Sequence, residues 1–369
     1  MSIFDRKPVL RWLAPVAALL VVGGAGGVVA ATATADDRLP SRSAAELLVD
    51  LQQVKVDAMS GTVVQESNLG IPDLPGLTSS DGASLTSLIS GTHTLDVWYS
   101  GPDKARLRVQ GNLDESDVIK NGSDVWTWSY KDKAATHRTL TADEKSDKSG
   151  SKAPADAPST PQEAAEQALK AIDPTTKVST DGTAKVAGRA AYELVLEPKD
   201  ANSLVQQVRI AIDGTEHIPL RVEVLTGADK PAFEVAYTNV DFNRPDDAQF
   251  EFNPPPGTKV TQVAPAEKRT AGKAPTEKEL QAKKEEAAKN TKIVGKGWST
   301  VVVTKVPAEQ SGQQGGQLTQ VLNSLPKVSG DWGSGRLLSG TAFSAVLTDD
   351  GRLAVGSVKP ELLYDALAK

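Results

Sequence analysis

The chain of 369 residues contains no cysteine. Disulfide bonds, thiolate metal sites, cysteine nucleophiles and a lipid-modified amino-terminal cysteine are therefore excluded. Histidine is nearly as scarce, since the only histidines are His93, His137 and His217, and none has metal-ligand spacing to another. We expect each of them to be a solvated residue of a strand or turn. The sequence predicts no metal site and no cofactor.

The sequence also lacks a strong charge of either sign and the common catalytic motifs. Its formal net charge is −6, with both signs intermixed, whereas nucleic-acid-binding domains present a basic surface. No glycine-rich phosphate loop and no Gly-x-Ser-x-Gly elbow is present. The carboxylate pairs Asp36-Asp37 and Asp349-Asp350 lie beside a processing site and in a turn, not in one cleft as acid–base catalysis requires. We predict neither a nucleic-acid partner nor an enzyme.

The first 39 residues have the pattern of a signal peptide or an N-terminal membrane anchor. Three basic residues precede an uncharged stretch, residues 12–35, that is rich in Ala, Val, Leu and Gly. Small residues near Ala35 offer a cleavage site, yet the stretch is also long enough to span a bilayer, which takes about 20 residues. Both alternatives stay open. In either case the remaining chain is extracytoplasmic, secreted or anchored to the outer face of the cytoplasmic membrane by residues 12–35.

Residues 192–252 contain four consecutive strands with period-two alternation, separated by turn signals. One face of this meander is bulky and apolar, and the other is charged. The apolar side chains are Tyr192, Leu194, Leu196, Val208, Ile210, Ile212, Leu220, Val222, Val224, Phe233, Val235 and Tyr237. The charged ones are Glu193, Arg209, Arg221, Glu223 and Glu234. Such a sheet needs a cover for its apolar face.

Two helices are available as that cover. Ser43 caps the first, with Glu46 as the reciprocal partner of a capping box. Pro161 begins the second, at the position where proline is favoured. Incomplete cover would leave a hydrophobic cavity suited to a small lipid, and complete cover would leave a dry core. Composition does not separate the two outcomes.

Further strands are predicted upstream of the meander, between residues 92 and 140. In one of them Trp126 and Trp128 point to the same face. We therefore group these tryptophans and Trp98 with the meander as candidate lining residues of a cavity. The full set is Trp98, Trp126, Trp128, Tyr192, Leu194, Val208, Ile210, Val222, Phe233 and Val235. A register error of one residue would invert the set of any strand.

Several short motifs, in their order, resemble the LolA-like lipoprotein carriers, a superfamily that includes RseB-type regulators of anti-sigma factors. The motifs are Ser60-Gly61-Thr62, Gly101-Pro102-Asp103-Lys104, Asn121-Gly122 and Phe250-Glu251-Phe252-Asn253 followed by three prolines and a glycine. The resemblance covers residues 40–262. It implies an α+β fold: a curved, unclosed antiparallel β-barrel, or half-barrel, lidded by helices. It also implies binding of lipid or lipoprotein acyl chains at a membrane surface.

Some segments depart from this core pattern. Residues 69–89 are apolar for a loop and form either a segment folded back on the core or a mobile flap. Residues 141–160 are polar and low in complexity. A charged linker, residues 263–292, precedes a small α+β domain, residues 293–369.

Two functions remain after these steps. The first is an exported, non-enzymatic carrier or chaperone that holds acyl chains of a lipid or lipoprotein in a hydrophobic half-barrel. The alternative is an RseB-like extracytoplasmic regulator that senses lipid or lipoprotein and binds an anti-sigma-type membrane partner. In that case residues 293–369 would contact the envelope protein.

Overall fold

The computed structural model describes residues 39–53, 56–70, 90–111, 114–140, 174–228, 230–263, 291–305 and 324–369. Within them the chain forms one sheet of twelve strands and one of six. The twelve strands are β1 (Ala58–Ser67), β2 (Gly91–Ser100), β3 (Lys104–Gln110), β4 (Glu115–Asn121), β5 (Asp124–Ser129), β6 (Ala134–Thr139), β7 (Thr176–Val186), β8 (Arg189–Pro198), β9 (Gln207–Asp213), β10 (Pro219–Leu225), β11 (Phe233–Asp241) and β12 (Lys259–Val263).

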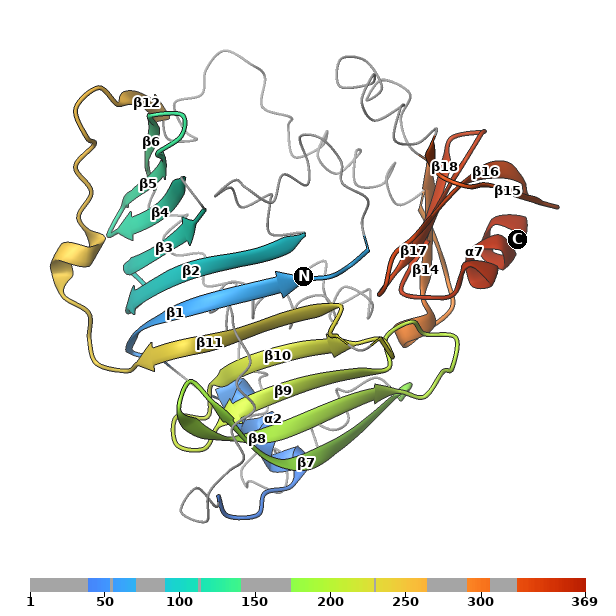
Figure 1. Cartoon of the computed structure of the whole chain (residues 1–369), viewed down its shortest axis with the longest axis horizontal. Helices are drawn as coiled ribbons and strands as arrows, with labels where there is room; N and C mark the ends of the chain where they lie inside the picture. The colour runs from blue at the N-terminus through green and yellow to red at the C-terminus, as the bar shows by residue number, and fades with distance from the viewer. Residues whose placement is uncertain are drawn as a thin grey trace.

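The large sheet is curved and does not close (Figure 1). Its strand order is β12-β6-β5-β4-β3-β2-β1-β11-β10-β9-β8-β7. The first strand of the chain, β1, pairs with β11 and so joins a first meander, β1–β6, to a second, β7–β11. Every pairing is antiparallel except that of β12 with β6. The antiparallel arrangement that the resemblance implies is therefore found in every pairing but the one at this edge. The chain crosses the sheet between β11 and β12, so β12 arrives alongside β6 in the same direction.

The register confirms that the meander has one apolar and one charged face. Leu194 lies opposite Ile210, which lies opposite Val222. Val222 lies opposite Val235 on β11. Glu223 and Glu234 are paired on the other face. We call the side that carries Val222 the apolar face and the side that carries Glu234 the polar face. The alternation arises because successive side chains of a strand point to opposite sides.

Helix α2 (Ala44–Gln53) packs on the apolar core. It begins with the predicted capping box: the backbone N–H of Ser43 donates to Glu46 Oε2 over 2.7 Å, and the Glu46 N–H donates to Ser43 Oγ over 3.3 Å. Leu47 is completely buried in the core of the large sheet. The second predicted helix, from Pro161, lies outside the described residues. The helical lid therefore stays a prediction, and the described part of the chain is mostly β.

The six-stranded sheet has the order β13-β14-β18-β17-β16-β15. Its strands are β13 (Thr291–Val294), β14 (Val301–Lys305), β15 (Lys327–Gly330), β16 (Gly333–Ser339), β17 (Ser344–Thr348) and β18 (Arg352–Gly356), followed by helix α7 (Pro360–Ala368). Leu363 and Leu367 of α7 pack against Val303 and Ala354 in a core separate from that of the large sheet. Strand β14 begins at Val301. A short 3-10 turn, η6 (Gly297–Ser299), precedes it.

The small sheet lies beside the large one (Figure 1), and backbone hydrogen bonds connect the two. The N–H of Leu204 donates to Ser357 O over 2.9 Å, and Ser203 forms a β-bridge with Val358. At a second point the N–H of Thr341 donates to Leu69 O over 2.8 Å. Residues 1–38 and 264–290 lie outside the described residues, so the predicted amino-terminal segment and most of the linker stay predictions.

Candidate functional site

Seven of the ten predicted lining residues share the apolar face of the large sheet. They are Tyr192, Leu194, Val208, Ile210, Val222, Phe233 and Val235. All are buried except Phe233, which is half-buried. The cover includes Leu47 of α2, with Leu48 and Leu51 packed against the same core. The seven therefore form one continuous apolar wall, and in this structure the wall is covered.

The three tryptophans lie on the opposite side, so the prediction that all ten line one cavity is wrong. Trp98 lies opposite Ser60 on β1 and Arg106 on β3. Ser60 alternates in phase with Glu66, which lies opposite Glu234 of the polar face. The same register continues through Ile119 to Trp126. Trp98, Trp126 and Trp128 are therefore residues of the polar face.

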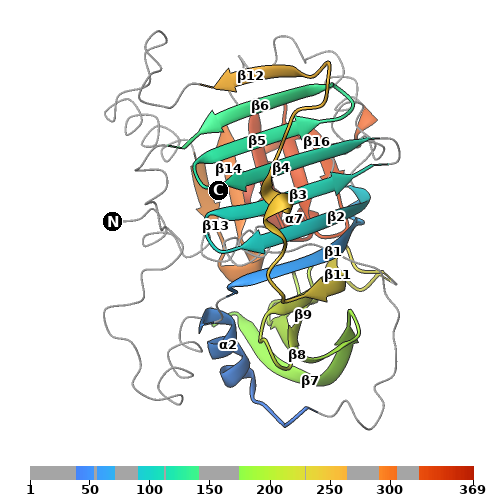
Figure 2. The ribbon, with the colours of Figure 1, turned by 90° about the vertical axis from the view of Figure 1, so that its left-hand side faces the viewer.

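Two of these tryptophans hold a segment of the chain against the sheet. We call residues 242–258 the strap; it contains the 3-10 turn η4 (Asp247–Phe250), and Figure 2 shows it crossing the strands from β11 towards β12. Phe252 lies 5.2 Å from Trp126 and 6.0 Å from Trp128, between ring centroids. Phe250 is only 1% exposed. The aromatic side chains of β5 thus contact the protein's own strap.

Cationic side chains of β3 complete the contact with the strap. Arg106 donates two hydrogen bonds of 2.9 Å to the carboxylate of Asp117 and one of 3.2 Å to Gln249 O. Its guanidinium carbon lies 5.4 Å from the centre of the Trp98 ring, and that of Arg108 lies 5.3 Å from the same ring. Lys104 forms an ion pair with Asp247 at 2.7 Å. Arg106 is therefore held on several sides by groups of the same chain.

The histidines do not form a site, but one of them corrects the sequence analysis. His93 is buried, not solvated, and its Nε2 lies 2.8 Å from Ser90 O. His137 stacks on Trp126 with ring centroids 4.2 Å apart and lies 2.8 Å from Asp124 Oδ1. His217 lies in a turn with φ of 57°. No group of three metal-ligating side chains occurs within the described ranges.

A buried charge network occupies the polar face of the second meander. Arg221 forms ion pairs with Glu193 and with Glu223, the latter over 3.3 Å between Arg221 Nη2 and Glu223 Oε2. Arg209 contacts Glu193 at 3.0 Å and Asp181 at 2.9 Å. Burial raises the pKa of Glu223, opposed by Arg221. The network was not predicted, because the charged residues of this face were expected to be wet.

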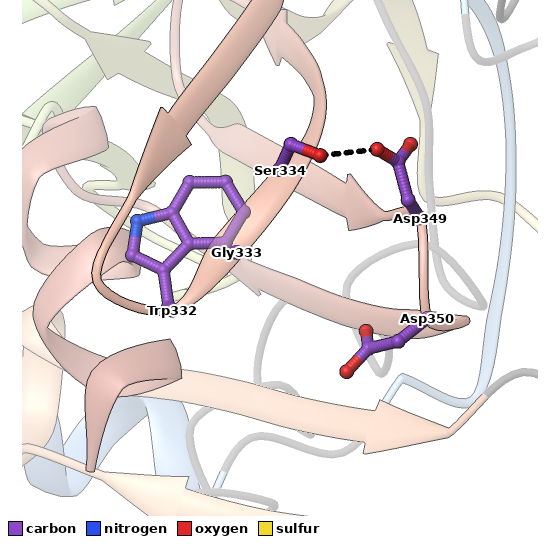
Figure 3. A pocket seen from close by; sticks show the side chains of 5 residues that line it. All are labelled: Trp332, Gly333, Ser334, Asp349 and Asp350. Carbon is purple, nitrogen blue, oxygen red and sulfur yellow. Dashed lines mark hydrogen bonds between the residues drawn. The ribbon is translucent and has the colours of Figure 1, made fainter.

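Two open hollows lie on the small sheet. One, of about 380 Å³, is lined by Trp332, Gly333, Ser334, Asp349 and Asp350 (Figure 3). Asp349 accepts a hydrogen bond from Ser334, and Asp350 accepts one of 2.8 Å from Arg352. Both carboxylates thus stabilise the turn, as expected for this pair. The other hollow, of about 290 Å³, lies beside Lys292, Lys305 and the end of α7.

A match to a known family spans the second meander and the strap. Residues 117–263 match the family model of the MucB/RseB N-terminal domain. The match begins in β4 and includes the apolar wall of the second meander, the strap and β12. It confirms the resemblance to RseB-type proteins over these residues. No curated protein matches the sequence.

Solved structures give weaker likenesses. A MucA/MucB complex from Pseudomonas aeruginosa shares 12% identity with a TM-score of 0.40, covering 88% of this chain and 96% of the other. An uncharacterised conserved protein from Thermus thermophilus shares 13% identity with a TM-score of 0.32, covering 59% and 98%. A LolA superfamily protein from Nitrosomonas europaea shares 12% identity with a TM-score of 0.21, covering 57% and 99%.

The strap is the feature that the sequence analysis did not assign. Its signal was present, because Phe250 and Phe252 flank a glutamate just before Pro254, Pro255 and Pro256. Prolines cannot donate ladder hydrogen bonds, so the segment cannot continue the meander as a central strand. Its two phenylalanines need burial elsewhere. The structure places both on the polar face.

Proposed function

We propose that this protein is an extracytoplasmic, non-enzymatic binding protein that holds the acyl chains of a lipid or lipoprotein against the apolar wall of the large sheet. The observation that carries the proposal is the alignment of seven apolar side chains across consecutive strands of one unclosed sheet. The family match over residues 117–263 supports it, because that match includes all seven.

Binding requires the cover of the wall to move, since its side chains are buried in the present structure. Leu47, Leu48 and Leu51 of α2 present to the wall the kind of surface that an acyl chain would offer. Each methylene of a chain that replaced them would contribute about 0.8 kcal/mol on leaving water. Exchange of one apolar cover for another costs little, so α2 can act as the displaceable part.

The same residues argue against catalysis on the wall. No carboxylate and no histidine belongs to the set of seven. Within the described ranges, no helix is long and apolar enough to cross a membrane. An extracytoplasmic place is supported by the basic, apolar amino-terminal pattern together with the RseB-type family match. A membrane surface would be the source of the acyl chains.

The test is native mass spectrometry on the exported full chain, purified without detergent, followed by lipid extraction. We expect stoichiometric adducts of lipid mass. Filling the wall with Val222→Trp should reduce them, and Trp98→Leu on the opposite face should not. An apo mass that stays unchanged after incubation with membrane lipids would contradict the proposal.

A second candidate function is that of an RseB-like regulator that binds an anti-sigma-type membrane partner. The specific observation in its favour is the MucB/RseB match in a chain that also carries a second sheet. MucB of Pseudomonas aeruginosa is described in complex with MucA. The corresponding partner here would be an envelope protein that binds through residues 293–369.

Cross-linking in the native cell tests this candidate. An anti-sigma-type protein should be recovered with the full chain and lost when residues 293–369 are deleted. The deleted protein must still show the β-sheet circular dichroism of the large sheet, so that loss of the partner is not loss of the fold. Recovery of the same partner with the deleted protein would contradict the assignment to residues 293–369.

A further inference from the structure

Three glutamates lie side by side on adjacent strands of the polar face. Glu234 of β11 lies opposite Glu66 of β1 on one side and opposite Glu223 of β10 on the other. Directly opposed side chains of neighbouring strands are about 5 Å apart at Cβ, and like charges in such positions repel. We call Glu66, Glu234 and Glu223 the glutamate row.

The neighbouring arginines do not neutralise the centre of this row. Arg221 is bound by Glu193 and lies 3.3 Å from Glu223. Arg209, opposite Glu223, contacts Glu193 and Asp181. The two guanidinium groups therefore contact Glu193, Glu223 and Asp181. Neither arginine forms an ion pair with Glu234 within the described residues.

Glu234 is also removed from water. It is 5% exposed, and no donor lies within hydrogen-bond distance of its Oε1 within the described residues. Burial of this oxygen without a donor disfavours the ionised form of the carboxyl relative to the neutral acid. Burial is the largest cause that raises the pKa of Glu234; Glu223 and Glu66 raise it further, and Arg221 opposes them. Burial likewise raises the pKa of Glu223.

We propose that the glutamate row holds a proton at Glu234 in the folded protein, and that release of this proton weakens the junction of β1, β11 and β10. This inference does not depend on the proposed function, because it concerns the polar face and requires no ligand. Its position gives it a consequence for the whole sheet. The pairing of β1 with β11 joins the first meander, β1–β6, to the second, β7–β11.

The direction of the effect follows from the raised pKa. A carboxyl whose pKa is higher in the folded than in the unfolded chain stabilises the folded state most below its unfolded pKa, about 4.3 for glutamate. That stability is lost as the pH rises through the folded pKa. The row itself therefore contributes less to the stability of the folded protein at neutral pH than at mildly acidic pH.

The apolar wall lies on the other face of the same strands. Val222 and Val224 alternate with Glu223 on β10, and Phe233 and Val235 flank Glu234 on β11. Loosening of the β11–β10 pairing on the polar face would therefore also disturb the wall. Through the glutamate row, a change of pH therefore changes the stability of the pairing of β1, β11 and β10.

The test compares Glu234→Gln with the natural full chain by thermal unfolding between pH 4 and 8. We expect the variant to melt higher at pH 7.5, by at least about 2 °C, and the difference to shrink towards zero near pH 4.5. Glu223→Gln should raise the melting temperature in the same direction, because it removes one of the two opposing charges. Glu251→Gln, an exposed residue of the strap, is the control and should change nothing.

A direct measurement keeps the inference testable if Gln is poorly accommodated. The glutamate side-chain carboxyls of the full chain are labelled with ¹³C and titrated by NMR. The resonance missing in Glu234→Gln should titrate at higher pH than the exposed glutamates. Amide exchange of β1 and β11, corrected for its intrinsic pH dependence, should rise over the same range. A Glu234 resonance that titrates with the exposed glutamates overturns the proposal.

Discussion

The indole N–H of Trp298 donates a hydrogen bond of 2.8 Å to Thr176 Oγ1. Trp298 lies in η6, just before the small sheet, and Thr176 is the first residue of β7. Beside this bond, Gly297 has φ of +54°, and a Cβ placed on it would lie 2.0 Å from Thr175 Oγ1. The close approach of η6 to the edge of the large sheet thus depends on a glycine.

Gly297→Ala should therefore weaken the contact between η6 and β7. The new methyl group must displace Thr175, and alanine is also disfavoured at positive φ. Together these effects should lower the free energy of unfolding by about 1–3 kcal/mol. Amide exchange in β7 and η6 would report the loosening. The matched control is Gly182→Ala in β7, which has φ of +64° but nothing within 4 Å of the added Cβ. Equal losses for the two variants would contradict the steric argument.

The buried ion pair of Arg106 and Asp117 should be far more sensitive than the neighbouring surface pair. Asp117 is 2% exposed, and Asp117→Ala leaves the guanidinium of Arg106 without its carboxylate partner. We therefore expect the free energy of unfolding to fall by about 3–5 kcal/mol. Asp247→Ala removes the partner of Lys104 but affects a carboxylate that is 70% exposed, and should cost less than about 1 kcal/mol. Chemical unfolding of both variants measures the difference. Similar losses would show that the pair of Arg106 is not the stabilising element.

The side chains that form the apolar face of the second meander could be predicted from the sequence. Each strand there has a clear period-two pattern, as at Leu194, Ile210, Val222 and Val235, and tight turns separate the strands. The placement of Trp98 could not be predicted in the same way. In its own strand, Leu95 and Val97 point to one face and Trp98 to the other, which indicates the polar face for Trp98. Aromatic residues are typical of cavity walls, however, and this favoured the wrong face. Alternation orders residues within a strand, and only the pairing with β1 and β3 relates distant strands to each other.

The buried charges were missed for a related reason. Glu193 and Glu234 alternate with apolar residues and therefore belong to the non-apolar face, but alternation does not say whether that face meets water. His93 illustrates the same limit, since it lies in a polar sequence and is nevertheless buried. Burial is a property of tertiary contacts, and for these residues the sequence carries no periodic signal of it.

The strap should be anchored chiefly by Phe250. This last residue of η4 is almost completely buried, so Phe250→Ala should lower the free energy of unfolding by about 3–5 kcal/mol. The loss should be accompanied by faster amide exchange in β12, which follows the strap. Tyr130→Ala, at a side chain that is 58% exposed, is the matched aromatic control and should stay within about 0.5 kcal/mol of the natural protein. An unchanged β12 in Phe250→Ala would show that the tryptophans alone hold the strap.

Asp213 should give a pH dependence of opposite sign to that of the glutamate row. Although burial raises the pKa of Asp213, hydrogen bonds from Arg189 and from the backbone N–H groups of Glu216 and Thr215 outweigh it, and the pKa is lowered. Arg189 Nη2 donates over 3.0 Å, and both backbone bonds are 2.8 Å long. A lowered folded pKa contributes stability above the unfolded value of about 3.9, and this stability is lost as the pH falls through the folded pKa.

Asp213→Asn should therefore be less stable than the natural protein at pH 7, by about 1–3 kcal/mol for the lost charged hydrogen bonds. This difference in the free energy of unfolding between the variant and the natural protein should disappear as the pH is lowered below 4, because the natural side chain then becomes neutral as well. Unfolding by urea at pH 7, 5 and 3 measures the gap. The control is Asp331→Asn, an exposed residue in the turn before β16, whose stability should follow that of the natural protein at every pH. A gap for Asp213→Asn that does not narrow in acid would mean that packing at this turn, and not the ionised carboxylate, provides the stability.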